Sequence, residues 1–191
     1  MKHAFVIGAL LAVAAPGAAL ADEFRYSNFE VSWNDVSLDS GVGNVNGDGL
    51  SFEGSYAMNK KLFLFGEYQD QSYDFGIDGT ALELGVGLHH ELSRTVDFVG
   101  TLSYLDSEVK VAGFGSADDN GFGIGGGVRT WLGTHFQLDA MLNWVDFDES
   151  GSDTGVSVDG RYYFKNKLAI SFGTNMTNDV DTFRVGFRAE F

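Results

Sequence analysis

Charged residues recur at alternate positions inside otherwise apolar stretches of this 191-residue sequence, and their types could do chemistry. Side chains two positions apart on an extended strand point to the same side. If the apolar residues face outward, the charged ones therefore face a shared interior. The acidic members of this inward set are Glu30, Glu53, Glu67, Glu83, Asp97, Asp139, Asp159 and Glu190, and the basic members are Arg129, Arg161, Arg184 and Arg188.

These inward charges allow two interpretations. In the first, the arginines pair with carboxylates and plug a narrow interior, because isolated buried charges are costly. In the second, they line a path for small cations or solutes, because rings of acidic side chains favour cations. Counting from the predicted turns places Glu53, Glu67, Glu83, Asp159 and Arg184 at mid-height, and Arg129, Arg161, Arg188, Asp139 and Asp97 lower. On the second interpretation Glu53, Glu67 and Glu83 are the filter.

Catalysis is a third possibility, which would need a nucleophile, a base and an orienting group that converge. The candidate bases His89, His90 and His135 fall in or near predicted short turns. The glycines of "GFGIGGGVRTW" (121–131) lie within a predicted strand, with no helix or lysine where a nucleotide-binding loop needs them. We therefore expect no enzymatic activity and no cofactor.

The acidity of the chain bears on its partners. A formal net charge of −15 argues against nucleic acid, because phosphate would be repelled. The longer polar connections predicted at 34–48, 70–79, 106–120, 146–154 and 177–181 hold sixteen carboxylates and a single lysine. Divalent cations are candidate partners there, since calcium favours clustered oxygen atoms. "NVNGDG" (44–49) lacks the glutamate that a calcium loop requires at its twelfth position, so we predict no specific metal site.

Strands must position these residues, because apolar residues alternate with polar or small ones almost throughout. Ten segments follow the pattern: 29–33, 50–58, 62–68, 82–88, 96–104, 122–132, 136–144, 156–164, 168–174 and 183–191. The first and third are the weakest, since Phe63 and Phe65 blur the alternation, and eight strands is the alternative.

Tight turns alternate with the longer polar connections, which is typical of an up-and-down antiparallel sheet. An even strand count and segments of about ten residues favour a closed transmembrane β-barrel, since only a closed sheet satisfies every backbone group in lipid. We predict one all-β domain over residues 22–191, without cysteine and with the only proline, Pro16, outside it.

The first 21 residues have the features of a secretory signal peptide. Lys2 supplies a basic start, Phe5–Ala15 is apolar, and Ala19–Ala21 is a small-x-small cleavage signal. We expect export through the general secretory pathway and a mature chain that begins at Asp22.

Four stretches resemble small opacity-protein-like and OmpA- or OmpX-type outer-membrane barrels of Gram-negative bacteria. They are "GSYAMNKKLFLFGEYQDQSYDF" (54–75), "LELGVGLHHELSRTVDFVGTLSY" (82–104), "GFGIGGGVRTWL" (121–132) and "RVGFRAEF" (184–191). The resemblance implies the cell outer membrane, with lipopolysaccharide and the barrel-assembly machinery as partners. It also implies that Phe187 and Phe191 form the C-terminal assembly signal.

The expected role is structural or surface-exposed in the cell envelope, as a monomer with a largely salt-bridged lumen. The acidic connections would lie outside the cell and both chain ends in the periplasm. A narrow porin for small cations or solutes is the alternative, and an outer-membrane enzyme is the least favoured.

Overall fold

The alternating segments form ten strands in the computed structural model, which describes residues 24–39 and 43–191. The predicted signal peptide lies outside the described residues. The strands are β1 (Asn28–Asp39), β2 (Asn44–Ala57), β3 (Leu62–Tyr73), β4 (Ile77–Ser93), β5 (Val96–Val111), β6 (Gly115–Leu132), β7 (Phe136–Phe147), β8 (Gly151–Lys165), β9 (Leu168–Met176) and β10 (Val180–Glu190). A single turn of 3-10 helix, η1 (Asp74–Gly76), joins β3 to β4.

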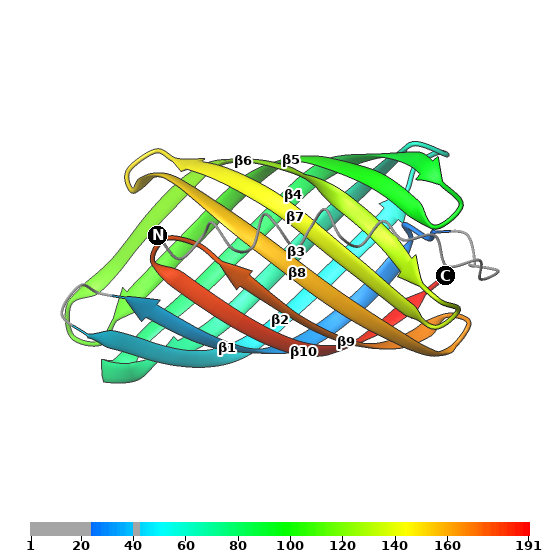
Figure 1. The fold of residues 1–191 in the computed structure, drawn as a ribbon. Helices are drawn as coiled ribbons and strands as arrows, with labels where there is room; N and C mark the ends of the chain where they lie inside the picture. Colours follow the sequence, from blue (N-terminus) through cyan, green and yellow to red (C-terminus); the bar gives the residue numbers. More distant parts are fainter. Residues whose placement is uncertain (1–23, 40–42) are drawn as a thin grey trace.

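Each strand pairs antiparallel with its neighbours in the chain, and β1 closes the sheet by pairing with β10. Figure 1 shows the strands wound around one axis and tilted against it. The prediction of a closed ten-stranded up-and-down barrel is confirmed, and the eight-stranded alternative is wrong. Closure leaves no sheet edge, which is the condition for a β-sheet in lipid.

Among the described residues, no helix has the length and apolar character needed to cross a membrane.

The two faces of the barrel are the reverse of those in a soluble sheet protein. On β10 the outward Phe187 is 48% exposed, whereas the next residue, Arg188, is 1% exposed. The same inversion holds on β1, where Phe29 and Trp33 are exposed and Glu30 is buried. The outer surface is therefore an apolar band suited to lipid, and the charges lie inside.

The strands are longer than the sequence pattern predicted, and the five long polar connections are a correction. β5 continues to Val111 and β6 begins at Gly115, so residues 112–114 are the whole connection where a loop over 106–120 was expected. The ladder runs on through pairs such as Asp106–Asn120 and Glu108–Asp118. Apolar alternation marks only the part of a strand that faces lipid, whereas backbone hydrogen bonding continues beyond it.

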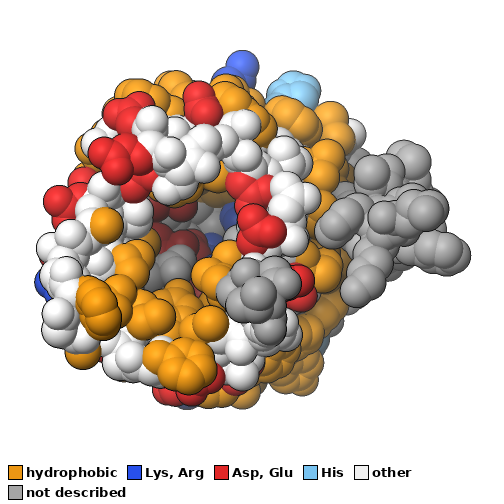
Figure 2. All heavy atoms as spheres, turned by 90° about the vertical axis from the view of Figure 1, so that its left-hand side faces the viewer, with side chains coloured by type: hydrophobic (Ala, Val, Ile, Leu, Met, Phe, Trp, Pro, Cys, Tyr) orange, Lys and Arg blue, Asp and Glu red, His pale blue; other side chains and the backbone are white. Residues whose placement is uncertain are grey.

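The two ends of the barrel differ in charge. We call "the turn end" the one with the connections 58–61, 94–95, 133–135 and 166–167, which hold four Lys and Arg residues, with Lys165 at the adjoining end of β8. We call "the acidic end" the opposite one, where the polar hairpins carry the sixteen carboxylates. Figure 2 views the acidic end and shows acidic side chains around its rim.

The weak alternation in β3 has a packing cause. Phe63 and Phe65 face inward opposite Gly87 and Gly85 of β4, and their rings lie over these glycines. A Cβ atom at Gly87 would stand 2.0 Å from the Phe63 ring, so only glycine fits there. Large side chains on one strand are thus accommodated by missing side chains on the next.

Gly87→Val should therefore destabilise the barrel by about 1–3 kcal/mol, the usual cost of overpacking. Adding Phe63→Ala to this variant should restore part of the loss, because it removes the ring that the new side chain meets. Urea unfolding of the refolded protein would measure both. Gly126→Val is the matched control, since a Cβ atom at Gly126 has no atom within 4 Å. Equal losses for Gly87→Val and Gly126→Val would contradict this packing.

Phe187→Lys should lower the free energy of unfolding in lipid by about 2 kcal/mol, because a charge on the lipid face is costly. Phe187 lies between Val31 and Ile170 on the outer face. Phe187→Leu, which keeps the face apolar, is the control. Heat-modifiable gel migration and unfolding in liposomes would report the loss, and a Phe187→Lys barrel as stable as the leucine variant would rule out this lipid-facing register.

Candidate functional site

The register of the sheet arranges the inward charges in two rows. Along β1 to β4, directly paired positions give one row: Glu30, Glu53, Glu67 and Glu83. Along β5 to β8, directly paired positions give another: Asp97, Arg129, Asp139 and Asp159. β10 contributes Arg184, Arg188 and Glu190 to the same interior. The row of charged residues on β1 to β4 is therefore entirely acidic, whereas the charged residues from β5 to β10 include both acidic and basic side chains.

Three arginines near the turn end belong to one buried network. Arg129 binds Asp139 through two nitrogens, with Nε 2.9 Å from Oδ1 and Nη2 2.7 Å from Oδ2. Arg161 reaches the same carboxylate at 2.6 Å and approaches Glu30 at 3.7 Å. Arg188 then lies 3.2 Å from Glu30.

Arg188 also joins this group to two further carboxylates. Its Nη1 is 3.7 Å from Glu53, and its Nε is 3.5 Å from Glu190. We call "the ion-pair network" the set Glu30, Arg129, Asp139, Arg161, Arg188 and Glu190. Buried charges persist only when they are paired, and here three arginines meet three carboxylates in addition to the contact with Glu53.

Aromatic side chains lie beside the network toward the turn end. Tyr26 donates a hydrogen bond to Asp97 at 2.8 Å, and the guanidinium of Arg129 lies 4.8 Å from the centre of its ring. Trp131 and Tyr163 pack against each other and are also buried. These rings and the ion-pair network therefore narrow the lumen near the turn end.

The part that Tyr26 plays was not predicted, because this residue lies in the segment before β1. Its inward direction could have been predicted, because Tyr26, Asn28 and Glu30 lie at alternate positions of the chain and therefore point to the same side. His89 lies inside near a turn, stacked on Tyr26 with ring centroids 3.9 Å apart and with Nδ1 3.1 Å from Asp97.

A cavity of about 690 Å³ extends from the acidic end into the lumen, and its lining reaches the ion-pair network and, past it, Tyr26 and Asn28. Figure 2 shows the hollow at that end. Its walls near the mouth are largely apolar, with Val36, Leu38, Val45, Ile77, Val109 and Val180 among the lining residues. Deeper in, the lining includes the carboxylates of Glu53, Glu67 and Glu83.

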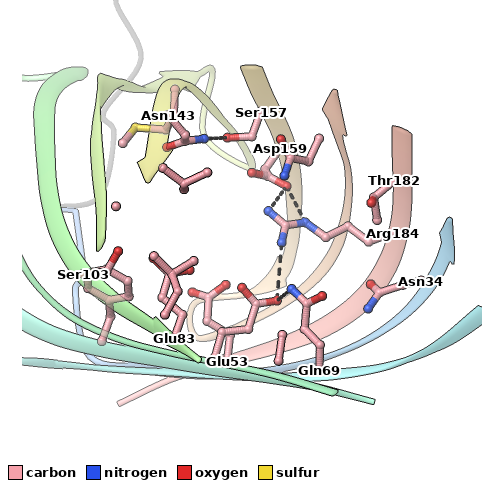
Figure 3. A pocket seen from close by; sticks show the side chains of 18 of the residues that line it. Asn34, Glu53, Gln69, Glu83, Ser103, Asn143, Ser157, Asp159, Thr182 and Arg184 are labelled. Atoms are coloured by element: carbon pink, nitrogen blue, oxygen red, sulfur yellow. Dashed lines mark hydrogen bonds and ion pairs between the residues drawn. The ribbon is translucent and has the colours of Figure 1, made fainter. Parts of the chain in front are cut away.

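Arg184 is the basic side chain that approaches the middle of this row of glutamates. It binds Asp159 through Nε at 2.8 Å and Nη2 at 2.7 Å, and its Nη1 is 3.9 Å from Glu67. Figure 3 shows Arg184 reaching toward the carboxylates, with Glu53 and Glu83 on the opposite side of the cavity. Among the described residues, no basic group lies within ion-pair distance of Glu83.

The structure thus separates the predicted site residues into two groups. Arg129, Arg161, Arg188 and Asp139 meet in the ion-pair network, whereas Glu53, Glu67, Glu83, Asp159 and Arg184 line the cavity beside it. Sequence spacing indicated these two levels. It did not indicate the cavity, which depends on the side chains of all ten strands.

The two predicted assembly-signal residues lie on and just after β10. Phe187 is on the outer face, and Phe191 follows the end of the strand with its side chain 63% exposed. The amide of Phe191 donates to the carbonyl of Ser27 at 3.1 Å, so the last backbone hydrogen bond of this side of the sheet reaches the segment before β1.

At the acidic end, carboxylates bind the backbone of neighbouring hairpins. Asp119 accepts hydrogen bonds from the amides of Glu149 and Ser150 at 3.1 and 2.9 Å, which ties β6 to the connection after β7. The hydroxyl of Ser150, together with these amides, lowers the pKa of Asp119. Within the described residues, no three His, Cys, Asp or Glu side chains converge in a way that could hold a metal ion.

The closed sheet, the apolar outer band and the charged lumen define a transmembrane β-barrel of the outer-membrane class. The family model described as "Outer membrane protein beta-barrel domain" matches residues 5–147, and the chain belongs to this family. Family membership places the protein in the outer membrane of the cell.

Several solved structures are similar to this chain at low sequence identity. Ail of Yersinia pestis is 14% identical with a TM-score of 0.47, covering 89% of this chain and 100% of its own. The N-terminal barrel of Pseudomonas aeruginosa OprF is 13% identical with a TM-score of 0.48, covering 86% and 99%. The translocator domain of NalP from Neisseria meningitidis is 11% identical with a TM-score of 0.49, covering 99% and 96%. No curated protein sequence matches the chain.

Arg188→Ala should lower the free energy of unfolding by about 3–5 kcal/mol, because it leaves buried carboxylates without a cation. Lys110→Ala removes an exposed partner of Glu108 at the acidic end and should cost at most about 1 kcal/mol. Urea titration of the two variants in the same detergent would compare them. If Arg188→Ala unfolded at the same midpoint as Lys110→Ala, the ion-pair network would not be holding the lumen together.

Proposed function

We propose that this protein is an envelope barrel with a closed lumen, whose role is structural or exposed at the cell surface. The observation that carries this proposal is the ion-pair network. Its side chains are almost entirely buried and, with Tyr26, Trp131 and Tyr163, occupy the lumen near the turn end. An ion that crossed the barrel would have to displace paired charges from each other, which is costly in a poorly solvated interior.

The charge difference between the two ends suggests an orientation. We propose that the acidic end faces the outside of the cell and the turn end the periplasm, after export through the general secretory pathway and insertion by the barrel-assembly machinery. Carboxylates outside the membrane would attract the divalent cations that surround lipopolysaccharide. The protein would act as a monomer, and no nucleic acid is expected to bind.

We also propose that the barrel is not an enzyme. The half-buried His89, a candidate base inside the barrel, is engaged by Asp97 and stacked on Tyr26. A nucleophile that transferred a proton to His89 would have to lie within hydrogen-bond distance of its ring, where Asp97 and Tyr26 already lie.

A narrow channel for small cations or solutes is the second candidate, and one observation favours it. The cavity reaches from the acidic end to Glu53, Glu67 and Glu83, and acidic side chains at a constriction select for cations. This function would require the ion-pair network to move aside.

The two candidates predict different electrical behaviour in planar bilayers under a salt gradient. The closed barrel should show no steady conductance. The triple variant Arg129→Ser/Asp139→Ser/Arg161→Ser, which removes paired charges together, should pass current because it clears the blocked cross-section. Steady cation-selective openings of the unaltered protein would overturn the closed-barrel proposal and support the channel.

A further inference from the structure

The cavity at the acidic end has the chemistry of a ligand site. We propose that it binds an extended organic cation with two or more ammonium groups, such as a linear polyamine, which enters from the acidic end. Its volume of about 690 Å³ is within the usual range for small-molecule sites.

The cavity is lined by more carboxylates than basic groups. In the ion-pair network Arg129, Arg161 and Arg188 are matched by Asp139, Glu30 and Glu190. Asp159 takes two nitrogens of Arg184 at 2.7 and 2.8 Å. Glu108 pairs with Lys110. Among the described residues, the carboxylates of Glu53, Glu67 and Glu83 have as contacts with basic groups only those of 3.7 Å to Arg188 and 3.9 Å to Arg184, beside neutral hydrogen bonds such as that from Gln69 to Glu67. A cationic ligand would supply what is missing.

The spacing of the three glutamates favours an elongated ligand over a single metal ion. They occupy directly paired positions on β2, β3 and β4. Neighbouring strands lie about 4.8 Å apart, so the outer two carboxylates start from backbones about 10 Å apart. In the described part of the chain these carboxylates do not converge on one point as metal ligands would. Ammonium groups separated by short alkyl chains match such a row.

Two unpaired acceptors provide independent support for a ligand that donates hydrogen bonds. Asn28 lines the cavity and is 3% exposed, yet its Oδ1 atom has no hydrogen-bond partner among the described residues. Asn175 on β9 also lines the cavity, and its Oδ1 is likewise buried and without a partner in the described chain. A buried acceptor without a donor is costly, and N–H groups of a ligand would satisfy both.

The walls above the glutamates fit the rest of such a molecule. Val36, Leu38 and Ile77 present apolar surface between the carboxylates and the mouth, where methylene groups could pack. The sixteen carboxylates of the acidic end would raise the local concentration of cations at the entrance. A ligand that enters from the acidic end would thus meet acidic charge at the mouth, then apolar walls, and then the acidic acceptors inside.

Isothermal titration of the refolded barrel in nanodiscs of zwitterionic lipid, with spermidine as the probe, tests this proposal. We expect saturable binding with a stoichiometry of one, weakened about tenfold or more by Glu83→Gln, since a lost charged contact inside a protein costs at least that factor. Asp118→Asn is the matched control. It removes the same charge from the acidic end outside the cavity, and it should change the Kd less than twofold.

Three outcomes would overturn the site. They are absence of saturable binding, an equal loss for Glu83→Gln and Asp118→Asn, and displacement of spermidine by equimolar Mg²⁺, which would indicate attraction by acidic charge alone. Urea unfolding of the Glu83→Gln variant without ligand guards against misfolding. If that variant does not fold, Glu67→Gln takes its place with the same expected result. Binding does not require conduction, so a silent barrel that binds spermidine supports both proposals separately.

Discussion

The structure depends on one constraint: in lipid, every backbone N–H and C=O group has to find its partner within the protein. A sheet meets this constraint only by closing on itself, and here β1 closes it against β10. Closure in turn creates an inside and an outside, and the pleat sends alternate side chains to each. The period-2 pattern of the sequence and the inverted burial of Phe187 and Arg188 are both results of that single requirement.

The closed interior then limits how charged side chains can be arranged. A ten-stranded ring leaves enough room for a cavity but too little for fully hydrated ions beside large side chains. The arrangement of charged side chains differs between two levels of the barrel. Near the turn end, Arg161 and Arg188 draw carboxylates together into a buried network. Closer to the acidic end, Glu67 and Glu83 face open space with fewer cations than carboxylates. The positions of the arginines thus determine which level of the lumen holds the ion-pair network and which holds the cavity.

Much of the fold could be predicted from the sequence, because alternation reports directly which residues face lipid. The strand count, the antiparallel order and the inward direction of the charged residues all follow from it. The ends of the strands could not be predicted, since the ladder of Glu108 with Asp118 continues where the apolar signal has stopped. Phe63 weakened the pattern because it is a large apolar residue at an inward position. The glycine that makes room for it, Gly87, lies on the next strand, so the neighbouring sequence does not indicate that such a residue can face inward. The two levels of charge in the site could be counted from the turns. The pairing of Arg161 with both Asp139 and Glu30 could not, because it depends on how side chains from β1, β7 and β8 reach across the lumen.

The continuation of the ladder beyond the apolar band also limits how the exposed surface of this protein can evolve. A residue inserted into the protruding part of β5 or β6 would shift every later pair and turn inward side chains outward. At the acidic end, the described residues outside the ladder are Gly43 and the short connections 74–76, 112–114, 148–150 and 177–179. Lineages under pressure to alter their surface would therefore lengthen these tips or exchange side chains on an unchanging frame, so diversity between relatives should be concentrated in narrow bands of the sequence.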